Sequence, residues 1–184
     1  MSYRSKLPAS WNDQPAARQV MIDLSSPGLA VFELERLLFT GRAIISHADE
    51  VWPRLYVGDQ HRITHVLNAA HSRRRGRPDI YEDMAVTYMG VEARDACDYD
   101  MSANFRSAAD FIHAALSRGG TVLVHCHVGV SRSATLVLAY LMLKQNLTLV
   151  EAICAVKDNR GVIPNRGFLR QLIRLNQQLF DKRS

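Results

Sequence analysis

The chain has 184 residues, of which 47% are hydrophobic and 22% charged, and it carries a net charge of +5. These values are typical of one soluble globular domain, and a chain of this length can bury a core without metal or disulfide links. The longest uncharged run near the centre, residues 133–143, is too short to span a bilayer, and the first residues lack the apolar stretch of a signal peptide. We therefore expect no membrane association and a cytoplasmic or nuclear location.

The N-terminal part of the chain predicts a flexible segment followed by a helix. Residues 1–27 are polar and hold three of the six prolines, so we expect a flexible N-terminal segment and a single domain over residues 28–184. Beyond it, Val31, Leu34, Leu37 and Leu38 recur at helical spacing before Gly41. This pattern predicts an amphipathic helix that packs on the main domain.

The middle of the chain predicts strands. Residues 54–58, 63–70, 86–91 and 121–125 have strand character, and the last run is nearly all apolar, as in a central strand covered on both faces. Three arginines follow Ser72 directly, and the basic cluster ends with a fourth at Arg77. The cluster fits either a nucleic-acid or nuclear-import signal or a solvated loop, and without interleaved aromatic residues we favour the loop. No nucleic-acid partner is therefore expected.

Helices predominate after residue 101. One is predicted from an N-cap at Ser102 to Gly119, a second over residues 132–145, a third from the capping-box pattern of Thr148 and Glu151, and a fourth over residues 168–180. Strands that first alternate with a helix and then give way to helices predict an α/β fold. We expect a single-domain sandwich with a central, mostly parallel, twisted sheet of about five strands flanked by helices.

The most informative stretch is VLVHCHVGVSRSATLVLAYLM, in which Cys126 follows the apolar strand directly. A loop of six residues leads from Cys126 to a helix that begins near Arg132, and Gly129 permits tight curvature there. A loop between a strand and a helix N-terminus gathers unpaired backbone N–H groups, which bind anions. A thiol in such a loop is expected to have a lowered pKa.

Arg132 adds a second phosphate-binding group to this loop. Its guanidinium can hold two phosphate oxygens while the Cys126 thiolate attacks phosphorus, which would give a cysteinyl-phosphate. Ser133 could donate a hydrogen bond to the departing thiolate. An acid is also needed for the leaving oxygen, and the loop over residues 92–100 offers Asp95, Asp98 and Asp100, among which chain physics alone does not choose.

The segment HCHVGVSRS resembles the HCxxGxSRS active-site loop of cysteine-dependent phosphatases, specifically the dual-specificity branch. The runs VWPRLYVGD, ITHVLNAA and IPNRGFL resemble other segments of that family, so the similarity covers about residues 31–179. It is strongest to the small atypical members of the skeletal-muscle and testis type. The resemblance implies activity on phosphotyrosine and on phosphoserine or phosphothreonine in proteins, with mitogen-activated protein kinases among the expected substrates.

The resemblance also implies roles for single residues. Cys126 becomes the nucleophile, Arg132 the phosphate clamp, Ser133 the aid to hydrolysis and Asp95 the general acid. His125 is expected to orient the surroundings of the thiolate, and Asn165 resembles a residue that braces the loop, although capping of the last helix fits it equally well. The expected substrate-binding residues are His127, Val128, Gly129, Val130, Ser131 and Arg132.

Other chemistries fit the sequence less well. His125 and His127 would lie on opposite faces of an extended chain, so we expect neither a metal site nor a cofactor. A phosphatase of phosphoinositides or RNA ends would share the Cys-x5-Arg loop, but phosphoinositide enzymes often carry lysines in it, and here its variable positions are His127, Val128 and Val130. A low-activity module that binds phosphoproteins remains a third alternative.

One feature departs from the family. Only four residues separate Gly58 from Ile63, where relatives place roughly a dozen more, including a helix. A parallel crossover with a helix needs about a dozen residues. We therefore expect that the helix between about residues 58 and 63 is missing, that one face of the sheet lacks its cover, and that stability is reduced.

Overall fold

The computed structural model describes residues 22–41, 48–58, 63–72 and 86–180. The predictions for residues 1–21, for the link 59–62 and for the arginine cluster from residue 73 on lie outside these ranges. Within them, five strands form one sheet in the order β1-β2-β5-β3-β4. The strands are β1 (Ala48–Trp52), β2 (Leu55–Gly58), β3 (His65–Asn68), β4 (Thr87–Gly90) and β5 (Val122–His125). Only β1 and β2 pair antiparallel, so the prediction of a mostly parallel sheet of about five strands is confirmed.

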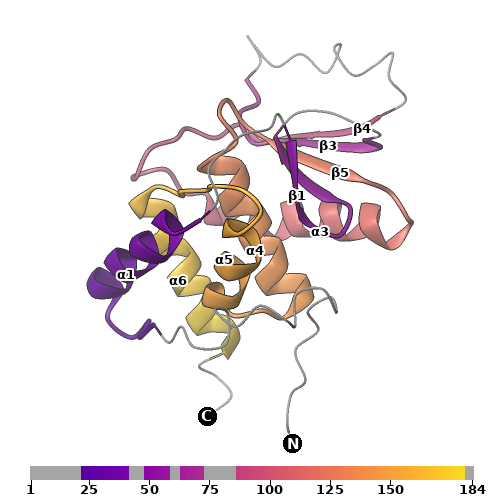
Figure 1. Cartoon of the computed structure of the whole chain (residues 1–184). Helices are drawn as coiled ribbons and strands as arrows, with labels where there is room; N and C mark the ends of the chain where they lie inside the picture. Colours follow the sequence, from indigo (N-terminus) through magenta and orange to yellow (C-terminus); the bar gives the residue numbers. More distant parts are fainter. Residues whose placement is uncertain (1–21, 42–47, 59–62, 73–85, 181–184) are drawn as a thin grey trace, which may run out of the picture.

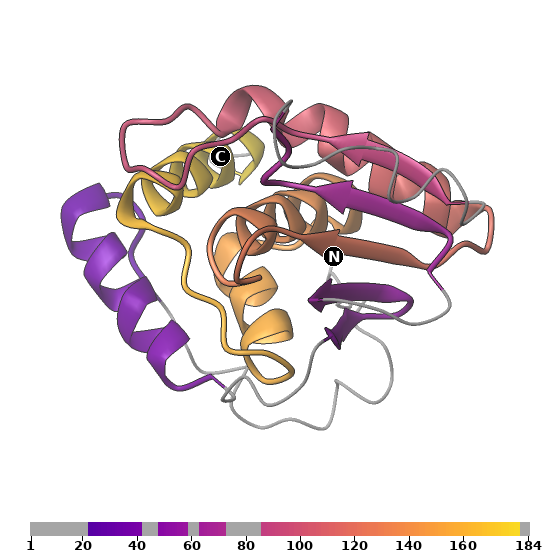
Figure 2. The ribbon, with the colours of Figure 1, turned by 90° about the horizontal axis from the view of Figure 1, so that it is seen from above.

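The helices of the described residues lie beside and below the sheet in the view of Figure 1. They are α1 (Pro27–Phe39), α3 (Phe105–Ser117), α4 (Arg132–Gln145), α5 (Leu149–Lys157) and α6 (Arg166–Phe180), and a short 3-10 helix, η2 (Ser102–Asn104), precedes α3. The apolar helix α4 is central: it packs against α3, α5, α6 and β5 (Figure 2). Within the described ranges, no helix is long and apolar enough to cross a membrane.

Most helix boundaries agree with the sequence patterns, with one correction. The capping box at Thr148 and Glu151 is present as predicted, and the last helix begins two residues early, at Arg166. Ser102 does not cap α3 as predicted, because α3 begins only after Asn104. Instead the Ser102 N–H and hydroxyl both donate to Asp100 Oδ1, at 3.0 and 2.5 Å, so the serine stabilises the turn before the helix.

The two faces of the sheet differ. On the face toward the helices, Val57, Val124 and Leu67 belong to the main hydrophobic core. On the other face one register row runs across four strands, through Tyr56, Leu123, Val66 and Tyr88. The two central residues of this row are buried and its two tyrosines are half-buried. The row thus has a buried aliphatic centre flanked by two half-buried aromatic residues.

Candidate functional site

The sequence places Cys126 at the carboxyl end of the central strand β5, where parallel strands open toward a crevice. The loop over residues 126–131, here the Cys126 loop, turns back on itself and leads directly into α4. Gly129 makes this turn possible, since its φ of +72° lies in the left-handed region that side chains disfavour. A Cβ at this position would also lie 3.0 Å from Arg160 Nη2, so a side chain here would press on the Arg160 guanidinium as well as strain the backbone.

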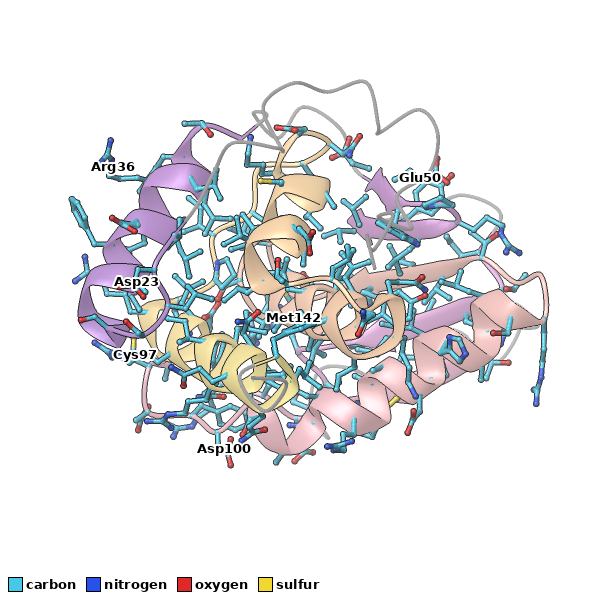
Figure 3. The ribbon with its side chains drawn as sticks, turned by 90° about the horizontal axis from the view of Figure 1, so that it is seen from below. Asp23, Arg36, Glu50, Cys97, Asp100 and Met142 are labelled. Carbon is cyan, nitrogen blue, oxygen red and sulfur yellow. The ribbon has the colours of Figure 1, made fainter. Side chains whose placement is uncertain are left out.

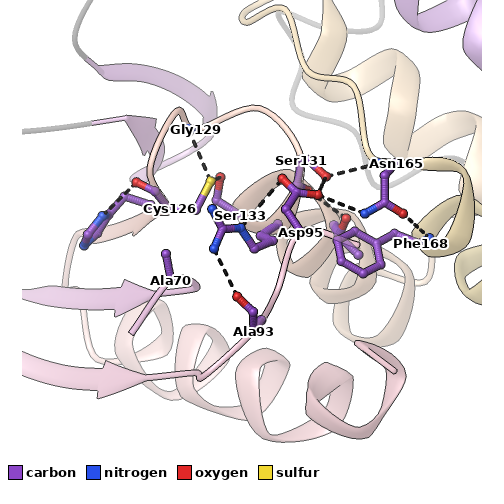
Figure 4. A network of polar contacts seen from close by, with 12 residues as sticks. Ala70, Ala93, Asp95, Cys126, Gly129, Ser131, Ser133, Asn165 and Phe168 are labelled. Atoms are coloured by element: carbon purple, nitrogen blue, oxygen red, sulfur yellow. Dashed lines mark hydrogen bonds and ion pairs between the residues drawn. The ribbon is translucent and has the colours of Figure 1, made fainter. Parts of the chain in front are cut away.

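Hydrogen-bond donors surround the Cys126 sulfur (Figure 4). The Gly129 N–H donates to Sγ at 3.2 Å, and the Ser133 hydroxyl lies 3.4 Å from Sγ. Burial raises the pKa of the Cys126 thiol, but hydrogen bonds from the Ser133 side chain and from the backbone of Ser133, Val128 and Gly129 outweigh burial, so the net pKa is lowered. The loop therefore favours the thiolate, which is the nucleophilic form.

The Arg132 guanidinium lies at the start of α4 and is largely buried. Its Nη1 donates to the Ala93 carbonyl at 3.0 Å, and its Nε lies 3.7 Å from Asp95 Oδ2. Within the described part of the chain, the buried Nε makes no hydrogen bond. A buried donor without an acceptor is costly, and an oxygen of a bound phosphate would satisfy it.

The structure distinguishes the three aspartates of residues 92–100, here the acid loop. Asp95 Oδ1 accepts hydrogen bonds from Ser131 Oγ at 2.8 Å and from Asn165 Nδ2 at 2.9 Å, so Asp95 joins the Cys126 loop. Asp98 instead pairs with the exposed Arg94 at 3.5 Å, and Asp100 is engaged by Ser102. Of these three aspartates, Asp95 is thus the one that accepts a hydrogen bond from a residue of the Cys126 loop.

Asn165 performs both functions between which the sequence could not choose. Its Oδ1 accepts from the Phe168 N–H at 3.0 Å, which caps α6, and its side-chain amide holds Asp95. Its backbone N–H also donates to Ser131 Oγ at 3.1 Å. One residue therefore connects the start of α6, the acid loop and the Cys126 loop.

Comparison with known proteins shows the family. The model of the dual specificity phosphatase catalytic domain matches residues 51–178, more than two thirds of the chain. The chain belongs to the dual-specificity phosphatases. It is 64% identical over 165 residues to dual specificity protein phosphatase 26 of Bos taurus, covering 83% of this chain and 78% of that protein. To the protein of the same name from Homo sapiens it is 61% identical over 171 residues, covering 86% and 81%.

Solved structures of dual-specificity phosphatases share this fold. Human DUSP28 superimposes with a TM-score of 0.66 at 28% identity and covers 74% of this chain and 97% of its own. A mouse putative dual specificity phosphatase, solved with zinc tungstate, has a TM-score of 0.66 at 27% identity and covers 77% and 93%. A human tyrosine phosphatase-like serine/threonine/tyrosine-interacting protein has a TM-score of 0.63 at 26% identity and covers 71% and 96%.

Sequence reasoning missed one contributor to the phosphatase loop, Arg160. This buried residue follows α5, donates from Nη1 to Asp49 Oδ2 on β1 at 2.7 Å, and donates from Nε to the Gly129 carbonyl at 3.3 Å. The neighbouring Ile163 N–H donates to the Val130 carbonyl at 3.0 Å. In the sequence Arg160 is an ordinary arginine of a polar turn, and only its distant partner Asp49 reveals its role.

The remaining predicted site residues lie at the rim or below the loop. His127 and Val128 are exposed, and His125 Nδ1 lies 3.4 Å from the Cys126 carbonyl oxygen.

The other two cysteines lie apart from the Cys126 sulfur. Cys154 is buried in α5, and burial raises the pKa of its thiol, while Cys97 is exposed in the acid loop. Among the described residues, no group of three or more His, Cys, Asp or Glu side chains is placed to hold a metal ion.

Proposed function

We propose that this chain hydrolyses phosphate monoesters on tyrosine and on serine or threonine side chains of proteins, through a cysteinyl-phosphate. The observation that carries the proposal is the Cys126 sulfur, with its lowered pKa, at the base of a loop whose Arg132 Nε still has donor capacity. Membership of the dual-specificity phosphatase family supports the same reaction.

In the first step, the Cys126 thiolate attacks phosphorus, an S–P bond forms and the P–O ester bond breaks. Backbone N–H groups of the Cys126 loop and the Arg132 guanidinium hold the phosphate oxygens. Asp95 donates a proton to the departing oxygen. Its Oδ1 is held by Ser131 and Asn165, so the transfer falls to Oδ2, which faces Arg132 Nε at 3.7 Å.

In the second step, water attacks phosphorus and the S–P bond breaks. The Asp95 carboxylate takes the proton from water, and inorganic phosphate leaves. The Ser133 hydroxyl, 3.4 Å from Sγ, stabilises the thiolate that departs. One carboxyl group thus acts first as acid and then as base.

The rim of the loop favours protein substrates over a highly charged lipid headgroup. Val128 is 71% exposed at the rim, Val130 is half-buried and no lysine lies in the loop. A phosphoinositide or RNA-end phosphatase is therefore the second choice. Mitogen-activated protein kinases in the cytoplasm or nucleus are the protein substrates that the family resemblance suggests first. The similarity to a phosphatase-like interacting protein keeps a binding module as the other alternative, but Cys126, Arg132 and Asp95 are all present here.

Turnover of an aryl phosphate by wild type and three variants tests the proposal. Cys126→Ser should abolish turnover, Arg132→Ala should raise KM and lower kcat, and Asp95→Asn should lower kcat about a hundred- to ten-thousand-fold. Activity that survives Cys126→Ser contradicts the mechanism. An unchanged pH profile in Asp95→Asn assigns the acid to another residue. Phosphopeptide and phosphoinositide panels then distinguish the substrate classes.

A further inference from the structure

A second concave site lies behind the acid loop, away from the Cys126 sulfur. It is a cavity of about 700 Å³ between the acid loop, the start of α3 and the outer face of α6. Figure 3, seen from below, labels two residues of its wall: Asp100 lies between the yellow α6 and the pink α3, and Cys97 lies at the other end of α6. The catalytic residues do not line this cavity, so it needs a separate explanation.

Three arginines line the cavity: Arg106, Arg170 and Arg174. Arg170 and Arg174 are four residues apart on α6 and therefore project from the same face, while Arg106 comes from the first turn of α3. All three are exposed, and within the described residues none of them forms a salt bridge. Their guanidinium groups thus remain able to bind anions bidentately.

The two aspartates of the wall offset only part of this charge. Asp98 pairs with Arg94, which lies outside the cavity lining. Asp100 is engaged by the Ser102 hydroxyl and N–H; these hydrogen bonds lower its pKa, and the positive charge of Arg174 lowers it further. With three arginines against two aspartates, the lining keeps a net charge of +1 and suits an anionic ligand.

The acid loop separates this cavity from the catalytic loop. Cys97 is two residues from Asp95, so their α-carbons are at most about 7 Å apart. On the α6 side, a Cβ built on Gly167 would lie 2.1 Å from the Cys97 carbonyl oxygen, so the acid loop lies directly against the helix. At about 3.3–3.6 Å per residue, an extended peptide needs only a few residues to pass from one site to the other.

We propose that the arginine-lined cavity binds acidic side chains of the phosphoprotein substrate, a few residues from the phosphorylated residue. This inference rests on the proposed function and adds a sequence preference to it, namely Asp or Glu flanking the phosphorylated residue. The ligand class is an acidic polypeptide segment, bound by ion pairs at a partly enclosed surface. Binding there should affect KM for peptides and leave the chemical step unchanged.

The test compares two phosphopeptides that differ only in flanking residues, one with Asp and Glu and one with Asn and Gln. The variant Arg170→Gln/Arg174→Gln should raise KM for the acidic peptide about five-fold at low salt. KM for the neutral peptide and turnover of an aryl phosphate should stay unchanged. The matched control, Arg36→Gln/Arg118→Gln, removes the same charge at exposed positions elsewhere. It should leave KM unchanged for both peptides.

Charge reversal provides the second arm. Arg170→Glu/Arg174→Glu should weaken binding of the acidic peptide further and should strengthen binding of a peptide with lysine flanks. Binding of the same peptides to a Cys126→Ser background, followed by fluorescence anisotropy, reports the preference without turnover. A peptide-independent loss, an equal effect of the control, or a fall in aryl phosphate turnover overturns the inference. Absence of turnover in wild type, with the acidic preference intact in binding, overturns only the proposed function.

Discussion

At the scale of single residues, the reactivity of Cys126 depends on donors that the chain places around one sulfur. Burial alone would disfavour the thiolate, and the hydrogen bonds of Ser133, Val128 and Gly129 reverse that effect on the pKa. Ser133 contributes through both its hydroxyl and its N–H, and only the hydroxyl can be removed by mutation. It is therefore the residue with which to test how the loop activates its nucleophile.

Ser133→Ala should shift the acidic limb of the kcat/KM profile to higher pH. Loss of the donor raises the pKa of Cys126, so at a pH below the optimum a smaller fraction is thiolate. We expect kcat/KM to fall about ten-fold there, which corresponds to the free energy of one hydrogen bond to a charged group. Near the optimum the fall should be smaller. The measurement is an aryl phosphate pH profile. Ser107→Ala, at an exposed serine of α3, is the control, and an acidic limb at the wild-type pH would contradict this role.

Residue-level prediction from sequence worked where the residues are contiguous. Cys126, Gly129 and Arg132 lie within seven positions, so loop chemistry follows from their order alone. The choice of Asp95 as the general acid needed the family resemblance, because Asp98 and Asp100 share its loop. Only the fold determines which carboxylate contacts Ser131. The role of Arg160 was not predictable, since its partner Asp49 is 111 positions away.

At the scale of elements, amphipathic spacing predicted the helices well, whereas pairing-dependent features were missed. The sequence ADEVW gives little strand signal, and β1 exists because it pairs antiparallel with β2 across a turn at Pro53 and Arg54. The wrong cap at Ser102 has a similar cause. Asp100, two residues earlier, accepts both donors of Ser102, so the serine is unavailable to the helix.

The contact between α6 and the acid loop gives a prediction at this scale. Gly167→Ala would force a Cβ against the Cys97 carbonyl, which must move by about 1 Å or more because the built distance is 2.1 Å. We expect a loss of about 1–3 kcal/mol in unfolding free energy, as for other overpacked sites, and a fall in kcat as Asp95 shifts. Denaturant unfolding and aryl phosphate turnover measure the two effects.

Gly28→Ala is the matched control for this substitution. Gly28 is also a helical glycine, but no atom lies within 4 Å of its added Cβ. This change should be neutral or stabilise by up to about 1 kcal/mol, with turnover unchanged. If Gly167→Ala behaved like Gly28→Ala, the acid loop would not depend on close packing against α6.

At the scale of the whole molecule, the register row from Tyr56 to Tyr88 lies on the face of the sheet opposite the main hydrophobic core. From the short link after Gly58 the sequence predicts that this face lacks a covering helix, and this stays a prediction, since residues 59–62 lie outside the described ranges. Its effect on stability remains a prediction. We expect a melting temperature no higher than the ordinary mesophilic range of about 45–65 °C.

Insertion of a helix-forming segment of about a dozen residues between Gly58 and Ile63 should raise this melting temperature. The added helix would cover the half-buried Tyr56 and Tyr88, and each kcal/mol gained corresponds to about 2–4 °C in a chain of this size. Thermal unfolding followed by circular dichroism measures the change, with an inserted Gly-Ser segment of equal length as control. A wild-type melting temperature well above the mesophilic range would contradict the expected weakness.

The bond between Asp49 and Arg160 also determines when the catalytic loop can form. Local contacts can build α4 and its preceding turn early, but the Gly129 carbonyl takes its donor from Arg160, 31 positions away, and the Arg160 guanidinium is fixed by Asp49, 111 positions away. Bringing such distant segments together is slow, because the entropy of closing a long loop must first be overcome. A refolding chain should therefore regain its helical circular dichroism before its ability to bind phosphate. Newly made molecules would then be folded but inactive for a time.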